Sequence, residues 1–151
     1  MMMKLRDRMP ELEGATDWLN SKSIRKTDLI GNKPTLIHFW SISCDLCKEV
    51  MPNINEFRDE YKDNLNIIAV HMPRSEKDLN FDEIKQAADE QDMTQPILID
   101  NFHKLTDAFK NKYVPSYYVF DSEGKLRHYQ AGGGGMRMLR KRVNRVLGIK
   151  E

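Results

Sequence analysis

The sequence predicts an α/β fold in which one central mixed β-sheet is flanked by helices. Short apolar runs alternate along the chain with amphipathic segments of helical period, which is the order typical of this class. The length of 151 residues suits one domain with a single substantial core. The last two apolar runs are joined by a short turn, as in an antiparallel hairpin. We therefore expect residues 1–151 to form a single domain.

Short runs rich in β-branched and aromatic residues predict the strands. They cover Thr35–Trp40, Leu65–His71, Pro96–Asp100, Ser116–Asp121 and Lys125–Gln130. The turn Asp121–Gly124 brings the last two runs side by side, so their hairpin is expected to close one edge of the sheet.

The helices are predicted from apolar residues spaced three and four apart. The segment from Cys44 to Tyr61 has this pattern, and its apolar face consists of Cys47, Val50, Met51, Ile54, Phe57 and Tyr61. Pro52 lies inside this helix and is expected to bend it, because proline lacks an N–H and its ring crowds the preceding turn. Further helices are predicted over Phe81–Gln91, Phe102–Asn111 and Met136–Leu147.

The composition argues against several classes of function. The formal net charge is +1, so no overall field attracts nucleic acid or an anionic membrane. No apolar run approaches the roughly 7–15 residues of a secretory signal or the roughly 20 of a membrane span, so a cytoplasmic protein is expected. No glycine-rich phosphate-binding pattern opens a helix, and no bound cofactor is expected.

The two cysteines, Cys44 and Cys47, form a CxxC motif where the first predicted strand gives way to the first long helix. So small a loop cannot brace a fold, but a thiol pair at this spacing can store and release two electrons. At a helix N-terminus, unpaired N–H groups and the positive end of the dipole stabilise a thiolate. We therefore predict that Cys44 attacks, with the lower pKa and the better access. Cys47, one turn inward, resolves the mixed disulfide.

A zinc site is the competing interpretation of the motif, because CxxC also supplies half of many zinc sites. Two further ligands would then be needed, and no other cysteine exists. The available histidines are His38, His71, His103 and His128, and none forms a second paired half. The position of the motif between a strand and a helix favours redox chemistry over metal binding, and no metal is expected.

The surroundings of the motif resemble those of a known family. Phe39 and Trp40 precede it, Lys48 follows it, and Pro52 lies five residues beyond the second cysteine. These residues resemble the active-site segment of thioredoxin. A segment inserted between the strand ending at His71 and the strand that follows resembles the central insertion of the TlpA/ResA branch. The chain is thus similar to the thiol–disulfide oxidoreductases of that branch.

The resemblance implies a thioredoxin-like fold and a site that binds protein disulfides. Val114–Pro115 looks like the family's cis-proline, with the Val114 backbone free to pair with an extended substrate segment. Trp40, Asp45 and Leu46 are expected to contact the substrate. The implied partners are protein disulfides and a regenerating reductant such as a thioredoxin reductase system, with the protein acting as a monomer.

Three positions depart from the family. The buried Asp six residues before the first cysteine is replaced by His38, the Glu of ResA-type proteins by Val50, and the Trp before the first cysteine by Ser43. A neutral imidazole at His38 can accept the Cys47 proton. The alternative is a core histidine bonded to backbone. Both hypotheses stay open.

Two further questions stay open at this stage. Asp45 favours a helix N-terminus but places a negative charge beside Cys44, which opposes thiolate formation. A non-catalytic module, acting as a redox sensor or partner-binding domain, is the second functional hypothesis. Retention of both cysteines argues against it, because a pure scaffold does not need them.

Overall fold

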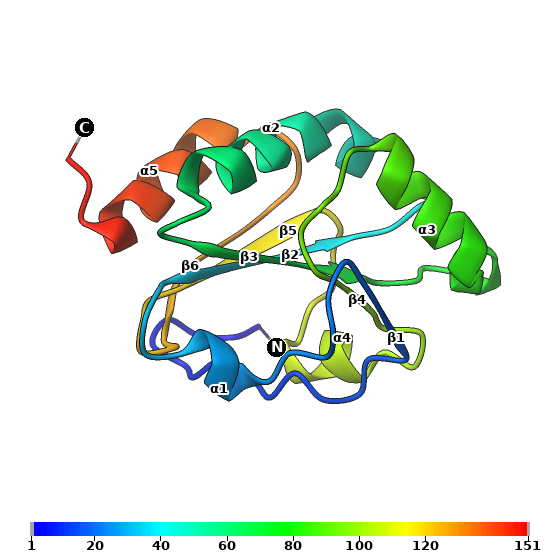
Figure 1. The fold of residues 1–151 in the computed structure, drawn as a ribbon, viewed down its shortest axis with the longest axis horizontal. Coiled ribbons are helices and arrows are strands. Elements are labelled where there is room, and N and C mark those ends of the chain that lie inside the picture. The colour runs from blue at the N-terminus through cyan, green and yellow to red at the C-terminus, as the bar shows by residue number, and fades with distance from the viewer. Residues whose placement is uncertain (1, 151) are drawn as a thin grey trace.

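Within residues 2–150, which the computed structural model describes, six strands form one mixed sheet (Figure 1). The strands are β1 (Asp17–Leu19), β2 (Thr35–Trp40), β3 (Asn66–His71), β4 (Ile97–Ile99), β5 (Ser116–Phe120) and β6 (Leu126–Ala131). Their order across the sheet is β1-β4-β3-β2-β5-β6. Thus β2, the strand that leads to the CxxC motif, lies in the interior of the sheet.

The middle of the sheet is parallel and its edges are antiparallel. Strand β2 pairs in parallel with β3, and β3 with β4. Strand β1 is antiparallel to β4, while β5 and β6 form the predicted hairpin beside β2. All six residues of β2 are buried, as expected for an interior strand covered on both faces.

Helices cover both faces of the sheet (Figure 1). They are α1 (Lys26–Leu29), α2 (Asp45–Tyr61), α3 (Phe81–Glu90), α4 (Lys104–Ala108) and α5 (Met136–Leu147), with a short 3₁₀ helix η1 (Glu76–Leu79). Helices α2, α3 and α5 lie over one face, and α1 and α4 over the other. Helices η1 and α3 form the connection from β3 to β4, where the central insertion was predicted.

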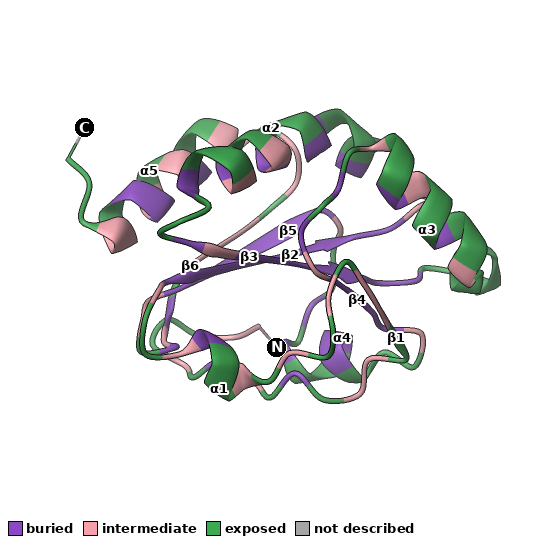
Figure 2. Cartoon of the chain, viewed as in Figure 1, coloured by how far each residue is buried: buried purple, intermediate pink, exposed green. Residues whose placement is uncertain are grey.

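Two apolar cores lie on the two faces of the sheet, and the interior strands β2, β3, β4 and β5 between them are buried, whereas the edge strands β1 and β6 are partly exposed (Figure 2). Leu36 and Trp40 of β2 belong to the core beneath α2, whereas Ile37 and Phe39 belong to the other. Because side chains alternate along a strand, His38 points to the same side as Leu36 and Trp40. The position of His38 is therefore under the CxxC helix.

The structure confirms the predicted strands and the helices around the motif, with bounds that differ by one or two residues at most ends. The helix predicted over Phe102–Asn111 was too long. It spans only Lys104–Ala108, and His103 before it and Lys110 two residues after its end have positive φ values, of 60° and 55°. Strand β1 and helix α1 were not predicted, because three or four residues are too few to show a period.

Asp100 determines where α4 begins. Its buried carboxylate accepts the N–H groups of Leu105 (2.9 Å) and Thr106 (2.8 Å), and also the Thr106 hydroxyl (2.7 Å). These bonds satisfy backbone donors that the first turn of a helix leaves unpaired.

Asp100→Ala is expected to lower the free energy of unfolding by roughly 2–4 kcal/mol, because it strands buried N–H donors. Urea denaturation monitored by circular dichroism measures this loss. The control Asp107→Ala removes an exposed carboxylate from the same helix and is expected to change stability by less than about 0.5 kcal/mol. Equal losses in the two variants would contradict the assigned role of Asp100.

Candidate active site

Cys44 caps the N-terminus of α2. Its Sγ accepts a hydrogen bond from the Cys47 N–H at 3.1 Å, and its own N–H donates to the Ser41 carbonyl at 3.2 Å. Cys44 and Cys47 are joined as a disulfide, with Cα atoms 5.3 Å apart. The Cys44 sulfur thus lies against the unpaired N–H groups of the helix, where negative charge is stabilised.

Both sulfur-bearing residues are buried in this disulfide form. Cys44 is 3% exposed and Cys47 1%. Access therefore hardly distinguishes the two cysteines in this state, since both belong to the apolar core under α2, and the better access expected of Cys44 stays a prediction for the reduced form.

The exposed part of the motif lies between the cysteines. Asp45 is exposed and Leu46 is 42% exposed, as substrate-contacting residues need to be. The backbone of Gly133 passes beside Leu46: a Cβ at Gly133 would lie 2.7 Å from Leu46 Cδ1. A larger residue at position 133 would therefore have to displace the Leu46 side chain.

The Val114–Pro115 peptide bond is cis, as the resemblance implied. Ser116 pairs with Phe39, so the register continues to Pro115 beside Trp40, at the end of β2 that leads to Cys44. The Pro115 carbonyl accepts the Gly132 N–H at 2.9 Å. Val114 packs against the core that contains both cysteines, and within residues 2–150 no group bonds to its backbone N–H or carbonyl.

Asn111 holds this loop in place and was not identified from the sequence. Its Nδ2 donates to the Tyr113 carbonyl at 2.9 Å, and its Oδ1 accepts the hydroxyls of Ser116 (2.7 Å) and Tyr118 (2.9 Å). A lone asparagine in a loop carries no pattern, so only the folded chain reveals these bonds.

Trp40 is completely buried, which is at odds with its predicted contact with substrate. Its ring meets that of His71 edge-on, with centroids 5.0 Å apart. The His71 Nε2 in turn accepts the Ile42 N–H at 3.1 Å. Burial lowers the pKa of His71 to about 4, so the ring is neutral at neutral pH and free to accept. Trp40 and His71 therefore support the turn that leads to Cys44.

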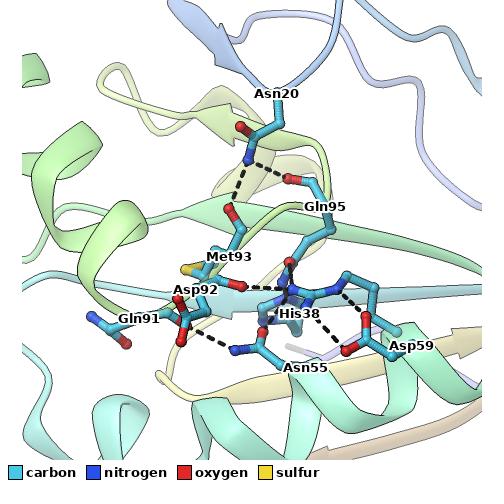
Figure 3. A network of polar contacts seen from close by, with 9 residues as sticks. Asn20, His38, Asn55, Asp59, Gln91, Asp92, Met93 and Gln95 are labelled. Carbon is cyan, nitrogen blue, oxygen red and sulfur yellow. Dashed lines mark hydrogen bonds and ion pairs between the residues drawn. The ribbon is translucent and has the colours of Figure 1, made fainter.

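His38 is buried and lies 3.1 Å from Gln95, measured between the imidazole Nε2 and the amide Nε2 (Figure 3). Burial, and secondarily the charge of Arg58, lower the pKa of His38 to about 3. A neutral imidazole accepts the amide N–H in this arrangement. The partner is a side chain, not the backbone that the sequence suggested.

A polar network extends from His38 towards the surface. Arg58 of α2 donates from Nη1 to Gln95 Oε1 (2.9 Å), Asn55 Oδ1 (3.0 Å) and the Asp92 carbonyl (2.8 Å). Figure 3 shows Gln95 between His38 and Asn20. The Asn20 side chain donates to the Gln95 backbone carbonyl. The arrangement favours a structural His38, because an imidazole with so low a pKa holds a proton weakly.

Within residues 2–150, no three His, Cys, Asp or Glu side chains converge as a metal-binding group. No helix in that part of the chain is long and apolar enough to cross a membrane.

Comparison with known proteins decides the family. The AhpC/TSA family model matches residues 5–129. The chain belongs to the AhpC/TSA family. This AhpC/TSA protein is 66% identical to the thiol-disulfide oxidoreductase YkuV of Bacillus subtilis (strain 168), over 99% of this chain and all of the relative. It is also 27% identical to the thiol-disulfide oxidoreductase ResA of Oceanobacillus iheyensis, over 81% of this chain and 61% of ResA.

A solved structure agrees with these relatives. The solution structure of a thioredoxin-like protein in the oxidised form is 65% identical and covers 99% of this chain and 100% of its own, with a TM-score of 0.89. The thioredoxin-like fold and the thiol–disulfide oxidoreductase activity predicted for this AhpC/TSA protein are thereby confirmed.

The lowered pKa of His38 predicts a stability that declines in acid. Unfolded chains bind the histidine proton near pH 6.5, whereas the folded protein resists it down to about pH 3. Protons therefore favour the unfolded state as the pH falls from 6.5 towards 3. Each such histidine lowers the free energy of unfolding by on the order of 1 kcal/mol per pH unit.

His38→Gln keeps a polar partner for Gln95 but cannot titrate. Its free energy of unfolding is expected to fall less steeply than that of the wild type between pH 6 and 4.5, by on the order of 1 kcal/mol per pH unit. Urea titrations at a series of pH values measure both slopes. Identical slopes would show that His38 titrates normally in the fold.

Proposed function

We propose that this thiol–disulfide oxidoreductase reduces or exchanges protein disulfides in two steps, with Cys44 attacking and Cys47 resolving. The observation that supports this assignment is the position of Cys44 at the N-cap of α2, where its Sγ accepts the Cys47 N–H. A thiolate at Cys44 keeps that stabilising bond, whereas Cys47 lies one turn inside the helix.

The reaction is two successive thiol–disulfide exchanges. The Cys44 thiolate attacks a substrate sulfur, a Cys44–substrate disulfide forms, and the substrate disulfide breaks. The departing substrate thiolate takes a proton from solvent. Cys47 then loses its proton and attacks the Cys44 sulfur, which releases the second substrate thiolate. The enzyme ends with the Cys44–Cys47 disulfide present in this structure, having given two electrons to the substrate.

Substrate binding is proposed for the surface around the motif. An extended substrate segment pairs with the backbone N–H and carbonyl of Val114, next to the cis Pro115. Asp45 and Leu46, both exposed, complete the contact on the α2 side, with Gly133 close behind Leu46.

Proton transfer from Cys47 to His38 stays a prediction. The surroundings of His38 weaken it, since a pKa of about 3 leaves the imidazole a poor base for a thiol whose ordinary pKa is about 8.5. A bond to Gln95 also occupies Nε2.

The regenerating reductant, the monomeric state and the cytoplasmic location also stay predictions. Regeneration requires a dithiol donor, such as a thioredoxin reductase system, that reduces the Cys44–Cys47 disulfide by the reverse exchange. Reconstitution with a purified reductase, light scattering and cell fractionation test the three in turn.

The roles of the two cysteines predict different behaviour for two serine variants. Cys44→Ser is expected to reduce insulin disulfides no faster than the dithiothreitol background, because the attacking sulfur is absent. Cys47→Ser is expected to attack but not resolve, so that a covalent adduct with the substrate accumulates. Turbidity of reduced insulin measures the first result, and mass spectrometry under non-reducing conditions measures the second.

Full activity in Cys44→Ser would remove the enzymatic assignment and favour a partner-binding module. Adducts formed through Cys47 in the Cys44→Ser variant, with none formed by Cys47→Ser, would reverse the two roles.

A further inference from the structure

We propose that Arg74 is a specificity-determining residue that binds a carboxylate of the substrate beside the disulfide attacked by Cys44. The substrate class is thus a protein disulfide with an acidic residue next to the reacting cysteine. The inference rests on the proposed function of Cys44 and adds a recognition element to it.

Arg74 is fixed to the residue before the attacking cysteine. Its Nε donates to the Ser43 hydroxyl at 3.1 Å, and its Nη2 donates to the Ser43 carbonyl at 2.6 Å. Two bonds to one residue hold a planar guanidinium in a defined orientation, so less side-chain entropy is lost when it binds a ligand. The cation is therefore placed one residue from Cys44.

Asp78 binds both Ser43 and Arg74. Its carboxylate is 1% exposed, and Oδ2 accepts both the Ser43 hydroxyl at 2.7 Å and the Arg74 backbone N–H at 2.9 Å. The Ser43 hydroxyl thus donates to Asp78, while its lone pair accepts from Arg74. A buried carboxylate aligned in this way orients Ser43 and Arg74 together, although the two come from segments 31 residues apart.

The Arg74 guanidinium has N–H donors that are not used within the described part of the chain. None of the ion pairs within residues 2–150 involves Arg74, and its Nη1 has no hydrogen-bond partner among those residues. Arg74 is also exposed. An arginine has five N–H donors in a fork that matches a carboxylate, so an exposed, oriented and unpaired one is suited to bind an acidic side chain.

The place of Arg74 beside Ser43 indicates which anion it binds. The substrate cysteine must approach Cys44, and Ser43, which holds Arg74, directly precedes it in the chain. A carboxylate within one or two residues of the substrate cysteine therefore reaches Arg74 during the attack. Asp45, which is exposed and directly follows Cys44, repels acids, whereas Arg74, held on the residue before Cys44, attracts them.

The test uses three peptide disulfides that differ only in an Asp, Asn or Lys beside the cysteine. Their reduction by wild-type enzyme, Arg74→Gln and Lys77→Gln is followed to obtain kcat/KM. Lys77 is the matched control, because it is an exposed cation in the same segment with no bond to Ser43. The pH dependence of Cys44 alkylation is measured in the same variants.

Wild-type enzyme is expected to reduce the Asp peptide about three- to fivefold faster than the Asn peptide, as an exposed ion pair provides. Arg74→Gln is expected to lose this preference while keeping its rate on the Asn peptide and its alkylation profile. Lys77→Gln keeps the preference. Because the pair is exposed, 0.5 M salt is expected to reduce the wild-type preference.

The proposal would be overturned by equal wild-type rates on the Asp and Asn peptides, by a preference retained in Arg74→Gln, or by the same loss in Lys77→Gln. An equal slowing on all peptides with a shifted alkylation profile would also overturn it, since Arg74 would then act on the Cys44 thiolate. Failure of the proposed function is separate, because the wild-type rate on the Asn peptide measures it alone.

Discussion

The hydrogen bond from the Cys47 N–H to the Cys44 sulfur is the contact on which the site depends. It exists only if Cys44 is the N-cap of α2, and this in turn requires β2 to end at Trp40. The turn between them is held at each step: the Ser41 hydroxyl donates to the Met72 carbonyl, and the Ile42 N–H donates to His71. Pairing of β2 with β3 brings both acceptors to this end of the sheet. The sheet therefore determines where the helix starts, and the helix start determines which sulfur carries the negative charge.

Two polar clusters lie on either side of this cap. Beneath α2, the buried neutral side chains of His38 and Gln95 contact each other, and the Arg58 guanidinium donates to the Gln95 side-chain oxygen. In front, Asp78 and Ser43 orient Arg74 beside Cys44. His38 stands where thioredoxins resembling this chain have a buried Asp, and its pKa of about 3 keeps the imidazole neutral at neutral pH. Of the charged groups in front of the cap, Asp78 is buried and Arg74 is exposed, and we propose that Arg74 binds the substrate.

Elements with a long apolar period were predictable from the sequence, and groups joined across the sheet were not. Helix α5 matches its predicted bounds because residues such as Leu139 and Val143 repeat at helical spacing towards one core. The cis Pro115 was implied by resemblance alone. The partner of His38 is 57 residues away, so no local pattern reveals it. Arg74 was missed for the same reason, since Ser43 is 31 residues away. Asn111 was missed because a lone asparagine in a loop has no pattern, although its partners are near in sequence. Trp40 lies in a strand that was predicted to be buried, and its burial conflicts only with the substrate contact that the resemblance implied.

The central claim is that the helix cap makes Cys44 the nucleophile. Reduced protein treated with less than one equivalent of iodoacetamide at a series of pH values, then digested and analysed by mass spectrometry, tests it most directly. We expect Cys44 to be modified first, with a rate that reaches half its maximum below about pH 8.5, the ordinary midpoint for a cysteine. Modification of Cys47 first, or a midpoint for Cys44 at or above that of an ordinary cysteine, would contradict the account.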